Sequence, residues 1–159
     1  MPPLSRPPKT FATIVIDANL AAALVLDLEF SELTSQVWRQ WQTSTTAVFA
    51  PQLWLYELAT ILRKAVALGG IQAQTAEEAL VAALQLGVTI VDADEDQCRS
   101  ALRWAERLGQ TAAYDSFYLA LASRLQADFW SADRRLVNAA RQAGLRWAHW
   151  VGELEVDAS

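Results

Sequence analysis

The feature that most constrains the fold of this chain is a series of short apolar runs that alternate with stretches of helical texture. The first run, at 13–16, reads Thr-Ile-Val-Ile and ends at Asp17. Such β-branched runs are typical of strands in parallel sheets, which helices cover on both faces. Runs at 46–50, 88–91, 128–131 and 145–150 predict four further strands. The sequence therefore predicts an α/β fold, with a mostly parallel five-stranded sheet flanked by helices.

Helices are expected in the segments between these runs. They are predicted over 19–28, 31–41, 51–68, from 75 onward, and over 92–109, 112–126 and 133–143. Ser31 is expected to cap the second helix, and Pro51 to lie in the first turn of the third. Thr75 is expected to form a capping box with Glu78. The third helix should end at Gly69, because glycine readily adopts the left-handed conformation that closes helices.

Length and composition indicate one domain. A chain of 159 residues, of which 53% are hydrophobic and 19% charged, can bury a sizeable core. Residues 12–150 are expected to form this domain, after a flexible leader at 1–11 with three prolines in its first seven residues. Residues 151–159 are expected to form a frayed tail. No apolar run approaches the roughly 20 residues that span a bilayer, and no secretory signal is recognisable, so a cytoplasmic location is expected.

The charge balance alone decides little about the partner. The net charge of −5 argues against broad electrostatic adhesion to nucleic acid. If four acidic residues are metal ligands, 14 acidic and 13 basic residues remain, and such a surface does not exclude a phosphate backbone. The chain has no GxSxG, HExxH, P-loop or GxGxxG motif, so the enzyme classes that use them lose their usual support. Its single cysteine, Cys98, offers neither a disulfide nor a thiolate metal cluster.

Two acidic residues stand at the ends of predicted strands. Asp17 directly follows the first strand, and Asp133 follows the fourth after one intervening residue. Ligands of open α/β sheets gather beyond the carboxyl ends of the strands, so both side chains are expected at that edge. The alternative is that each of them only caps the helix that follows it.

Two further acidic residues lie within predicted helices. At about 100° per residue, Glu57 falls on the apolar stripe of its helix, where a carboxylate is costly to bury without a partner. The alternative is a residue at the edge of the stripe that pairs with Arg63 or Lys64. Asp115 has apolar neighbours at i+4 and i+7, and the small alanines around it allow close approach to another element. A helix cap is again the alternative.

Together, Asp17, Glu57, Asp115 and Asp133 predict a metal site. Clustered carboxylates repel one another, and they keep their charge only with a cation between them. Oxygen ligands, without a Cys or His candidate, favour Mg²⁺ or Mn²⁺ over zinc. The lone His149 is not expected to be a ligand or a general base. Such ions activate water and neutralise the charge that develops on a phosphodiester.

Four segments of the chain resemble a PIN domain, and most of all the VapC-type toxins of bacterial toxin–antitoxin pairs. They are IVIDAN at 14–19, YELATILRK at 56–64, YDSFYLALA at 114–122 and WSADRRL at 130–136. Their order and spacing cover about residues 12 to 150. Ser131 stands where the family more often has threonine, and Ser116 where it more often has alanine.

The resemblance implies a Rossmann-like sheet and Mg²⁺- or Mn²⁺-dependent cleavage of RNA, often by a homodimer that an antitoxin neutralises. The family's acidic positions are taken by Asp17, Glu57, Asp115 and Asp133, and its small supporting polar positions by Asn19 and Ser131. Arg134 and Arg135, next to Asp133, are candidates for guiding RNA to the metal. We therefore expect a metal-dependent endoribonuclease that is the toxin of a toxin–antitoxin pair.

Two other functions and one structural question stay open at this point. The same fold could be a non-catalytic RNA-binding or dimerisation module. Another Mg²⁺-dependent phosphoryl-transfer enzyme, such as a phosphatase with an aspartyl nucleophile, usually has a DxD strand end, whereas this strand ends Asp17-Ala18-Asn19. Trp38 and Trp41, at i and i+3, either pack in the core or form a dimer or antitoxin surface.

Overall fold

A five-stranded sheet lies at the centre of the molecule, in a computed structural model that describes residues 13–155. The strands are β1 (Thr13–Ile16), β2 (Ala47–Pro51), β3 (Thr89–Val91), β4 (Asp128–Ser131) and β5 (Ala148–Trp150). They follow the order β3-β2-β1-β4-β5, and every neighbouring pair is parallel. This confirms the predicted α/β fold and its single sheet.

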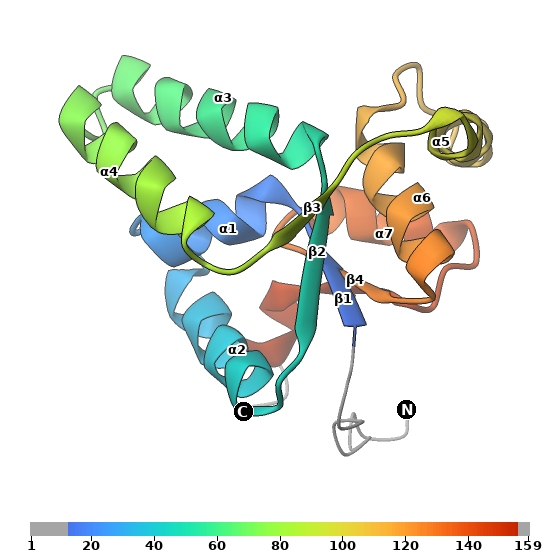
Figure 1. Cartoon of the computed structure of the whole chain (residues 1–159), viewed down its shortest axis with the longest axis horizontal. Helices are drawn as coiled ribbons and strands as arrows, with labels where there is room; N and C mark the ends of the chain where they lie inside the picture. Colours follow the sequence, from blue (N-terminus) through green and yellow to red (C-terminus); the bar gives the residue numbers. More distant parts are fainter. Residues whose placement is uncertain (1–12, 156–159) are drawn as a thin grey trace.

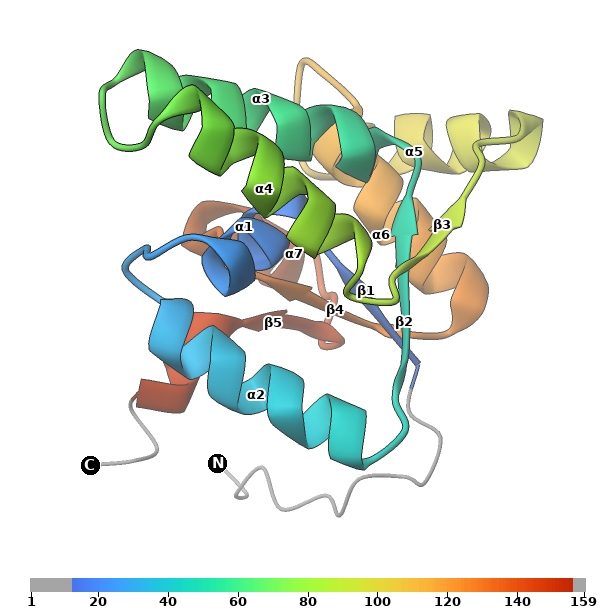
Figure 2. The same cartoon turned by 60° about the vertical axis from the view of Figure 1, so that its left-hand side comes forward.

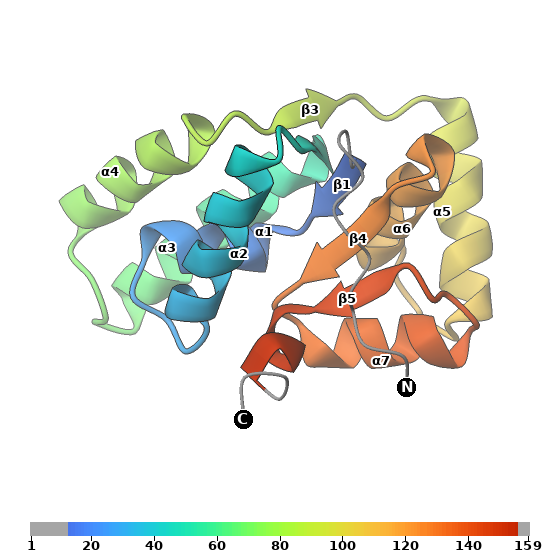
Figure 3. The ribbon, with the colours of Figure 1, turned by 90° about the horizontal axis from the view of Figure 1, so that it is seen from below.

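Helices cover both faces of the sheet (Figures 1 and 3). One face carries α1 (Ala18–Val25), α2 (Ser31–Thr43), α3 (Leu53–Ala67) and α4 (Ala73–Leu84). The other carries α5 (Glu95–Arg107), α6 (Tyr114–Leu125) and α7 (Arg134–Gln142). Figure 2 shows α3 and α4 side by side at one end of the first layer and α2 at the other. In the described part of the chain, no helix has the length and apolarity needed to cross a membrane.

The core forms where the central strands meet these helices. Val15, Ile16 and Phe129, on β1 and β4, are fully buried. Most of the buried residues of α1 are alanines, which let neighbouring elements approach this helix closely. Trp38 is also buried, and Trp41 packs edge-on against it. The core interpretation of these two tryptophans is therefore correct.

The strand order creates a topological switch point between β1 and β4. From β1 the chain builds β2 and β3 on one side, and it later returns to add β4 and β5 on the other. Connections that leave adjacent strands in opposite directions open a crevice at the carboxyl ends of those strands. Asp17 directly follows β1 and Asp133 lies two residues after the end of β4, so these two acids flank the crevice.

One predicted helix cap and two predicted helix starts are wrong. Ser31 is the first residue of α2 and not its cap, because its hydroxyl bonds to two backbone groups of the preceding loop. Pro51 ends β2, where it pairs with Val91, and α3 begins two residues later. The helix α4 begins before Thr75 and has no side-chain cap. The predicted end of α3 is correct, since Gly69 follows the helix with a φ of 76°.

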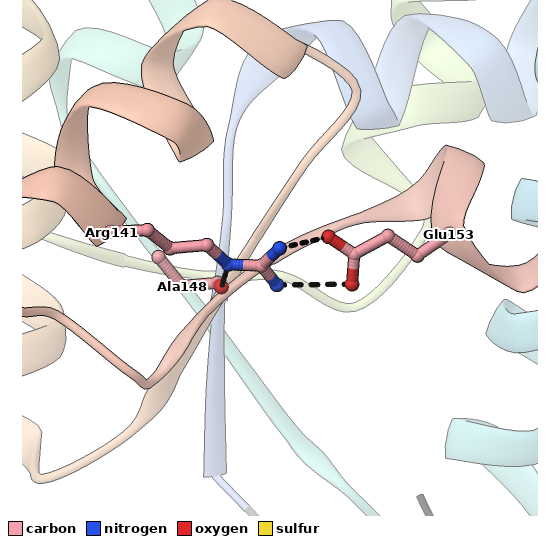
Figure 4. Close-up of polar contacts among 3 residues, drawn as sticks. All are labelled: Arg141, Ala148 and Glu153. Carbon is pink, nitrogen blue, oxygen red and sulfur yellow. Dashed lines mark hydrogen bonds and ion pairs between the residues drawn. The ribbon is translucent and has the colours of Figure 1, made fainter. Parts of the chain in front are cut away.

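The segment expected to fray is helical where the structure describes it. Residues Val151–Glu155 form the 3-10 helix η1, whose first residue is fully buried. Arg141 of α7 donates from Nε to the carbonyl oxygen of Ala148 (3.0 Å), and its guanidinium makes a two-pronged ion pair with Glu153 (Figure 4). The prediction of a frayed tail is therefore wrong for 151–155. Residues 156–159 and the predicted leader at 1–11 lie outside the described residues.

Candidate active site

Asp17 is buried at the switch point and is only 3% exposed. Its backbone N donates to the carbonyl oxygen of Trp130 (3.3 Å), and Trp54 Nε1 donates to the carbonyl oxygen of Asp17 (3.3 Å). Oδ1 accepts from Leu20 N (2.8 Å), so Asp17 caps α1. Oδ2 accepts a hydrogen bond from Ser131 Oγ. Because each carboxylate oxygen has two lone pairs, capping does not prevent Asp17 from binding a further group.

Ser131 connects Asp17 to Asp133. Its hydroxyl is fully buried, donates to Asp17 Oδ2, and accepts from Asp133 N (2.8 Å). Asp133 caps α7, since its Oδ1 accepts from the backbone N of Arg135 (2.9 Å) and of Leu136 (3.3 Å). Both hydrogen bonds that the Asp133 carboxylate accepts among the described residues go to Oδ1, which leaves Oδ2 for a ligand. One serine thus couples the two acids that follow β1 and β4.

Glu57 is held by a residue that the sequence analysis did not select. It lies half-buried on α3, and its Oε2 accepts a hydrogen bond from the hydroxyl of Tyr118 on α6 (2.7 Å). Burial and the charges of Glu57 and Asp17 raise the pKa of Tyr118, so the phenol stays protonated as a donor. Among the described residues, Glu57 has no ion pair with Arg63 or Lys64. Tyr118 could have been noticed from its spacing, because i+3 from Asp115 places it on a neighbouring face of the same helix.

Asp115 and Asn19 lie where two hollows adjoin. A hollow of about 430 Å³ contains Glu57, Asp115 and Asn19 among its lining residues. A second hollow, of about 390 Å³, is lined by Asn19, Asp133, Arg134 and others. Asn19 is exposed and borders both of them. Glu57, Asp115 and Asp133 therefore line hollows that share Asn19, and Asp17 lies buried, hydrogen-bonded to Ser131.

The carboxylates are coupled electrostatically in a closed ring. The pKa of Asp17 is raised to about 7, because burial and the charges of Glu57 and Asp133 outweigh the hydrogen bonds from Ser131 and Leu20. Burial and then the charge of Asp115 raise the pKa of Glu57, while the Tyr118 hydrogen bond lowers it. Burial and then the charge of Asp133 raise the pKa of Asp115. The charge of each acid thus affects, or is affected by, that of two others.

The donor set fits a hard divalent cation. Within residues 13–155, no three Asp, Glu, His or Cys side chains are arranged as a ready-made metal cage. Mg²⁺ does not require one, because it usually keeps several waters and binds to one or two carboxylates together with substrate phosphates. Burial raises the pKa of Asp17, and a cation beside this carboxylate would favour its charged form. All four side chains offer oxygen, which suits Mg²⁺ or Mn²⁺.

The two arginines after Asp133 lie at the edge of the second hollow. Arg134 and Arg135 are exposed and line it. The Arg134 guanidinium lies over the ring of Trp150, 5.0 Å from its centroid, which restrains its position. His149 instead faces Asp128, with 3.3 Å between Nε2 and Oδ2, and its ring stacks on Trp130. Most of the predicted site residues thus line the two hollows, whereas Asp17 and Ser131 are buried and His149 contacts a different carboxylate.

Comparisons with known proteins bear on the family and the fold of this chain. The sequence model of the PIN domain family matches residues 14–142. The solved structure of PAE2754 from Pyrobaculum aerophilum is 21% identical, with a TM-score of 0.64 over 92% of this chain and 88% of that chain. VapC20 of Mycobacterium tuberculosis, described as a toxin that cleaves the sarcin-ricin loop, is 18% identical. Its TM-score is 0.60 over 79% of this chain and 94% of that chain.

A third similar structure is VapBC2 of Rickettsia felis, solved with a DNA fragment from its promoter. It is 10% identical, with a TM-score of 0.62 over 83% of this chain and 93% of that chain. At these identities the likeness is one of fold. No protein with a curated description matches the sequence significantly.

Proposed function

Because this chain belongs to the PIN domain family, we propose that it is an endoribonuclease that hydrolyses phosphodiester bonds of RNA with Mg²⁺ or Mn²⁺. The observation that carries the proposal is the ring of coupled carboxylates formed by Asp17, Glu57, Asp115 and Asp133. The charges of neighbouring acids raise the pKa of three of them. A protein keeps such an arrangement at a cost in stability, and a bound cation offsets that cost.

In this proposal, Asp17 and Asp115 would hold the ion. When bound, the ion would supply an activated water and neutralise charge on the scissile phosphate. Glu57 would complete the site or position the attacking water, and Tyr118 keeps its Oε2 oriented. Asp133 would hold a second ion or act from the outer shell.

We further propose that the chain is the toxin of a toxin–antitoxin pair that acts in the cytoplasm as a homodimer. The solved structures with a similar fold include a VapC toxin and a VapBC structure, which supports this assignment. Expression of the wild-type protein in bacteria should arrest growth, whereas expression of Asp17→Asn should not. Light scattering of the purified protein should give the mass of two chains.

The nuclease proposal is tested by RNA cleavage with Mg²⁺ or Mn²⁺ against EDTA. Asp17→Asn should lower the cleavage rate about 100-fold or more, because the ion contributes several kcal/mol to the transition state. Asparagine is as good a helix cap as aspartate, so the variant should remain folded. The control is Asp96→Asn, the same change at an exposed position on α5. A folded Asp17→Asn protein that cleaves at the wild-type rate would remove the proposal.

A second candidate is a non-catalytic module with the same fold. The observation in its favour is that no three acidic side chains of the described residues form a ready-made metal cage. Calorimetric titration with Mn²⁺ separates the two candidates. Binding at a defined stoichiometry that Asp17→Asn abolishes supports the nuclease, and the lack of any binding supports the module.

A further inference from the structure

The exposed aromatic side chains of the described residues gather at one place. Tyr56 is 62% exposed and Tyr114 is 66% exposed. Every other aromatic residue within 13–155 is buried or half-buried, including all seven tryptophans. Both tyrosines line the hollow of about 430 Å³ that contains Glu57 and Asp115. The two exposed rings therefore border the candidate active site itself.

The helical geometry explains how rings and acids share this hollow. Each tyrosine immediately precedes an acid, Tyr56 before Glu57 on α3 and Tyr114 before Asp115 on α6. One residue is a turn of about 100° around a helix. The acids thus face the interior of the site, where they are half-buried, and the tyrosines stand at its rim. The rings come from two different helices on opposite faces of the sheet.

Positive groups lie beside the rings and in the adjoining hollow. Lys64 lines the hollow with the tyrosines. Beyond Asn19, Arg134 and Arg135 line the adjoining hollow. This combination of exposed rings and basic side chains is what sequence-tolerant sites for single-stranded nucleic acid use: the rings stack on bases, and the cations follow the phosphates.

From this arrangement we propose that Tyr56 and Tyr114 stack on unpaired bases of the RNA and so position the strand at the acids. The inference rests on the proposed nuclease function and adds two residues that position the substrate. Inside an RNA duplex the faces of the bases are covered by their neighbours, so the rings have nothing to stack on. In an unpaired segment every base offers a face. Stacking at this rim brings the adjoining phosphates toward the acids.

The test measures how the rings affect binding of RNA with and without bases. Fluorescence anisotropy follows a labelled 12-nucleotide RNA of mixed sequence, the same strand in a duplex, and an abasic chain with the same phosphates. Ca²⁺ replaces Mg²⁺ to hold back cleavage, and a gel checks that the strand stays intact. The variants are Tyr56→Ala, Tyr114→Ala and the two Tyr→Phe changes. Leu102→Ala, at a residue 66% exposed on α5, is the matched control.

We expect each alanine variant to bind the single strand about tenfold more weakly than wild type. Affinity for the abasic chain should change less than twofold, and the phenylalanine variants should bind like wild type. Because both tyrosines are exposed, the melting temperatures should stay within a few degrees of wild type. Wild-type affinity in both alanine variants, or an equal loss for the abasic chain, overturns stacking.

Other outcomes separate this inference from the proposed function. A wild-type protein that cleaves RNA, with alanine variants that bind the single strand normally, overturns stacking and leaves the nuclease intact. A wild-type protein that binds none of the three probes overturns both. If the alanine variants change the oligomeric mass in light scattering but not the RNA affinity, the rings serve a contact between protein chains, and the inference is wrong.

Discussion

Asp17 combines two roles at the end of β1 that are physically compatible. Its carboxylate caps α1 through Oδ1 and accepts from Ser131 through Oδ2. These hydrogen bonds favour the charged form, yet burial outweighs them and raises the pKa to about 7. A carboxylate that served only as a cap would gain nothing from complete burial beside other acids. In the proposed nuclease this residue would link the stability of the fold to cation binding.

The stability of the metal-free protein should fall as the pH rises from about 4 to 7. Asp17 has a pKa near 3.9 in the unfolded chain and about 7 in the fold, so the folded state binds more protons across this window. The contribution of Asp17 to the free energy of unfolding is fully present below its pKa in the unfolded chain. It is lost as the pH rises through the pKa in the folded protein, and the total loss is up to roughly 4 kcal/mol. Asp17→Asn should remove this loss. Urea denaturation in EDTA at pH 4.5 and 8 measures it.

The raised pKa values of Glu57 and Asp115 act in the same direction, so some pH dependence should persist in the Asp17→Asn variant. The variant should exceed wild type in stability at pH 8 and match it near pH 4. An advantage of the same size at both pH values would contradict the assignment of the buried charge to Asp17.

Tyr118→Phe should weaken metal binding with little loss of packing. The change removes only the hydroxyl that donates to Glu57 Oε2 (2.7 Å), while the buried ring stays. Residues that orient a metal ligand typically contribute about 10- to 100-fold to affinity. We expect about tenfold weaker Mn²⁺ binding by calorimetry. Tyr114→Phe, which removes a hydroxyl from an exposed ring, should have no effect. Unchanged Mn²⁺ affinity in Tyr118→Phe would show that Glu57 needs no such orientation.

At the scale of elements, the ends of helices decide the geometry of the site. Asp17 and Asp133 each cap a helix, and the hydroxyl of Ser131 joins these two caps. Because the caps follow adjacent strands, the register of β1 against β4 sets their separation. The helices α3 and α6 then bring Glu57 and Asp115 from opposite faces of the sheet. The site therefore depends on the first ends of two helices and on the faces of two others, and no single sequence motif forms it.

Arg141→Lys should loosen the last element, η1. Arginine makes three hydrogen bonds here, one to Ala148 and two to Glu153, and the compact ammonium of lysine cannot reproduce this fork. The pair is partly exposed, so the expected loss is about 1 kcal/mol in urea denaturation. Hydrogen exchange at 151–155 should accelerate. Arg146→Lys, at an exposed position, is the control, and an equal loss in both variants would contradict this account.

At the scale of the whole molecule, the parallel order β3-β2-β1-β4-β5 concentrates function at one edge. The switch point lies between β1 and β4, and the acids, the two hollows and the exposed tyrosines all border it. The net charge of −5 includes the four acids of this edge, which reduces the charge of the remaining surface. A cation at the switch point would bind the folded chain only, since the unfolded chain does not hold the four acids together.

Mn²⁺ should therefore raise the melting temperature of the entire domain. At 100 times the dissociation constant, binding to the native state adds about 2.7 kcal/mol. For a domain of this size that corresponds to a shift of roughly 5–10 °C. The shift in melting temperature should be smaller at pH 5.5, where Asp17 is protonated. The ion must then displace a proton from this carboxyl group, which weakens binding. Differential scanning calorimetry measures it, and a shift that Asp17→Asn retains in full would place the ion elsewhere.

The sequence by itself determined the kinds of elements, because the β-branched run at 13–16 and the capping residues act over a few positions. It also marked Asp17 and Asp133 as residues at strand ends. Local rules assigned one wrong cap and one wrong helix start, because the Ser31 hydroxyl bonds to the preceding loop and Pro51 belongs to β2. They also missed the 3-10 helix η1, which depends on Arg141 from a different element.

Only the tertiary structure decided which acids meet. Neighbours in the ring, such as Glu57 and Asp115, are far apart along the chain, and their coupling depends on burial that no local pattern encodes. The same holds for the bond from Tyr118 to Glu57 and for the two exposed tyrosines at one rim. The physical reason is range: propensities and caps act within a few residues, whereas desolvation and charge repulsion depend on every element packed around a group.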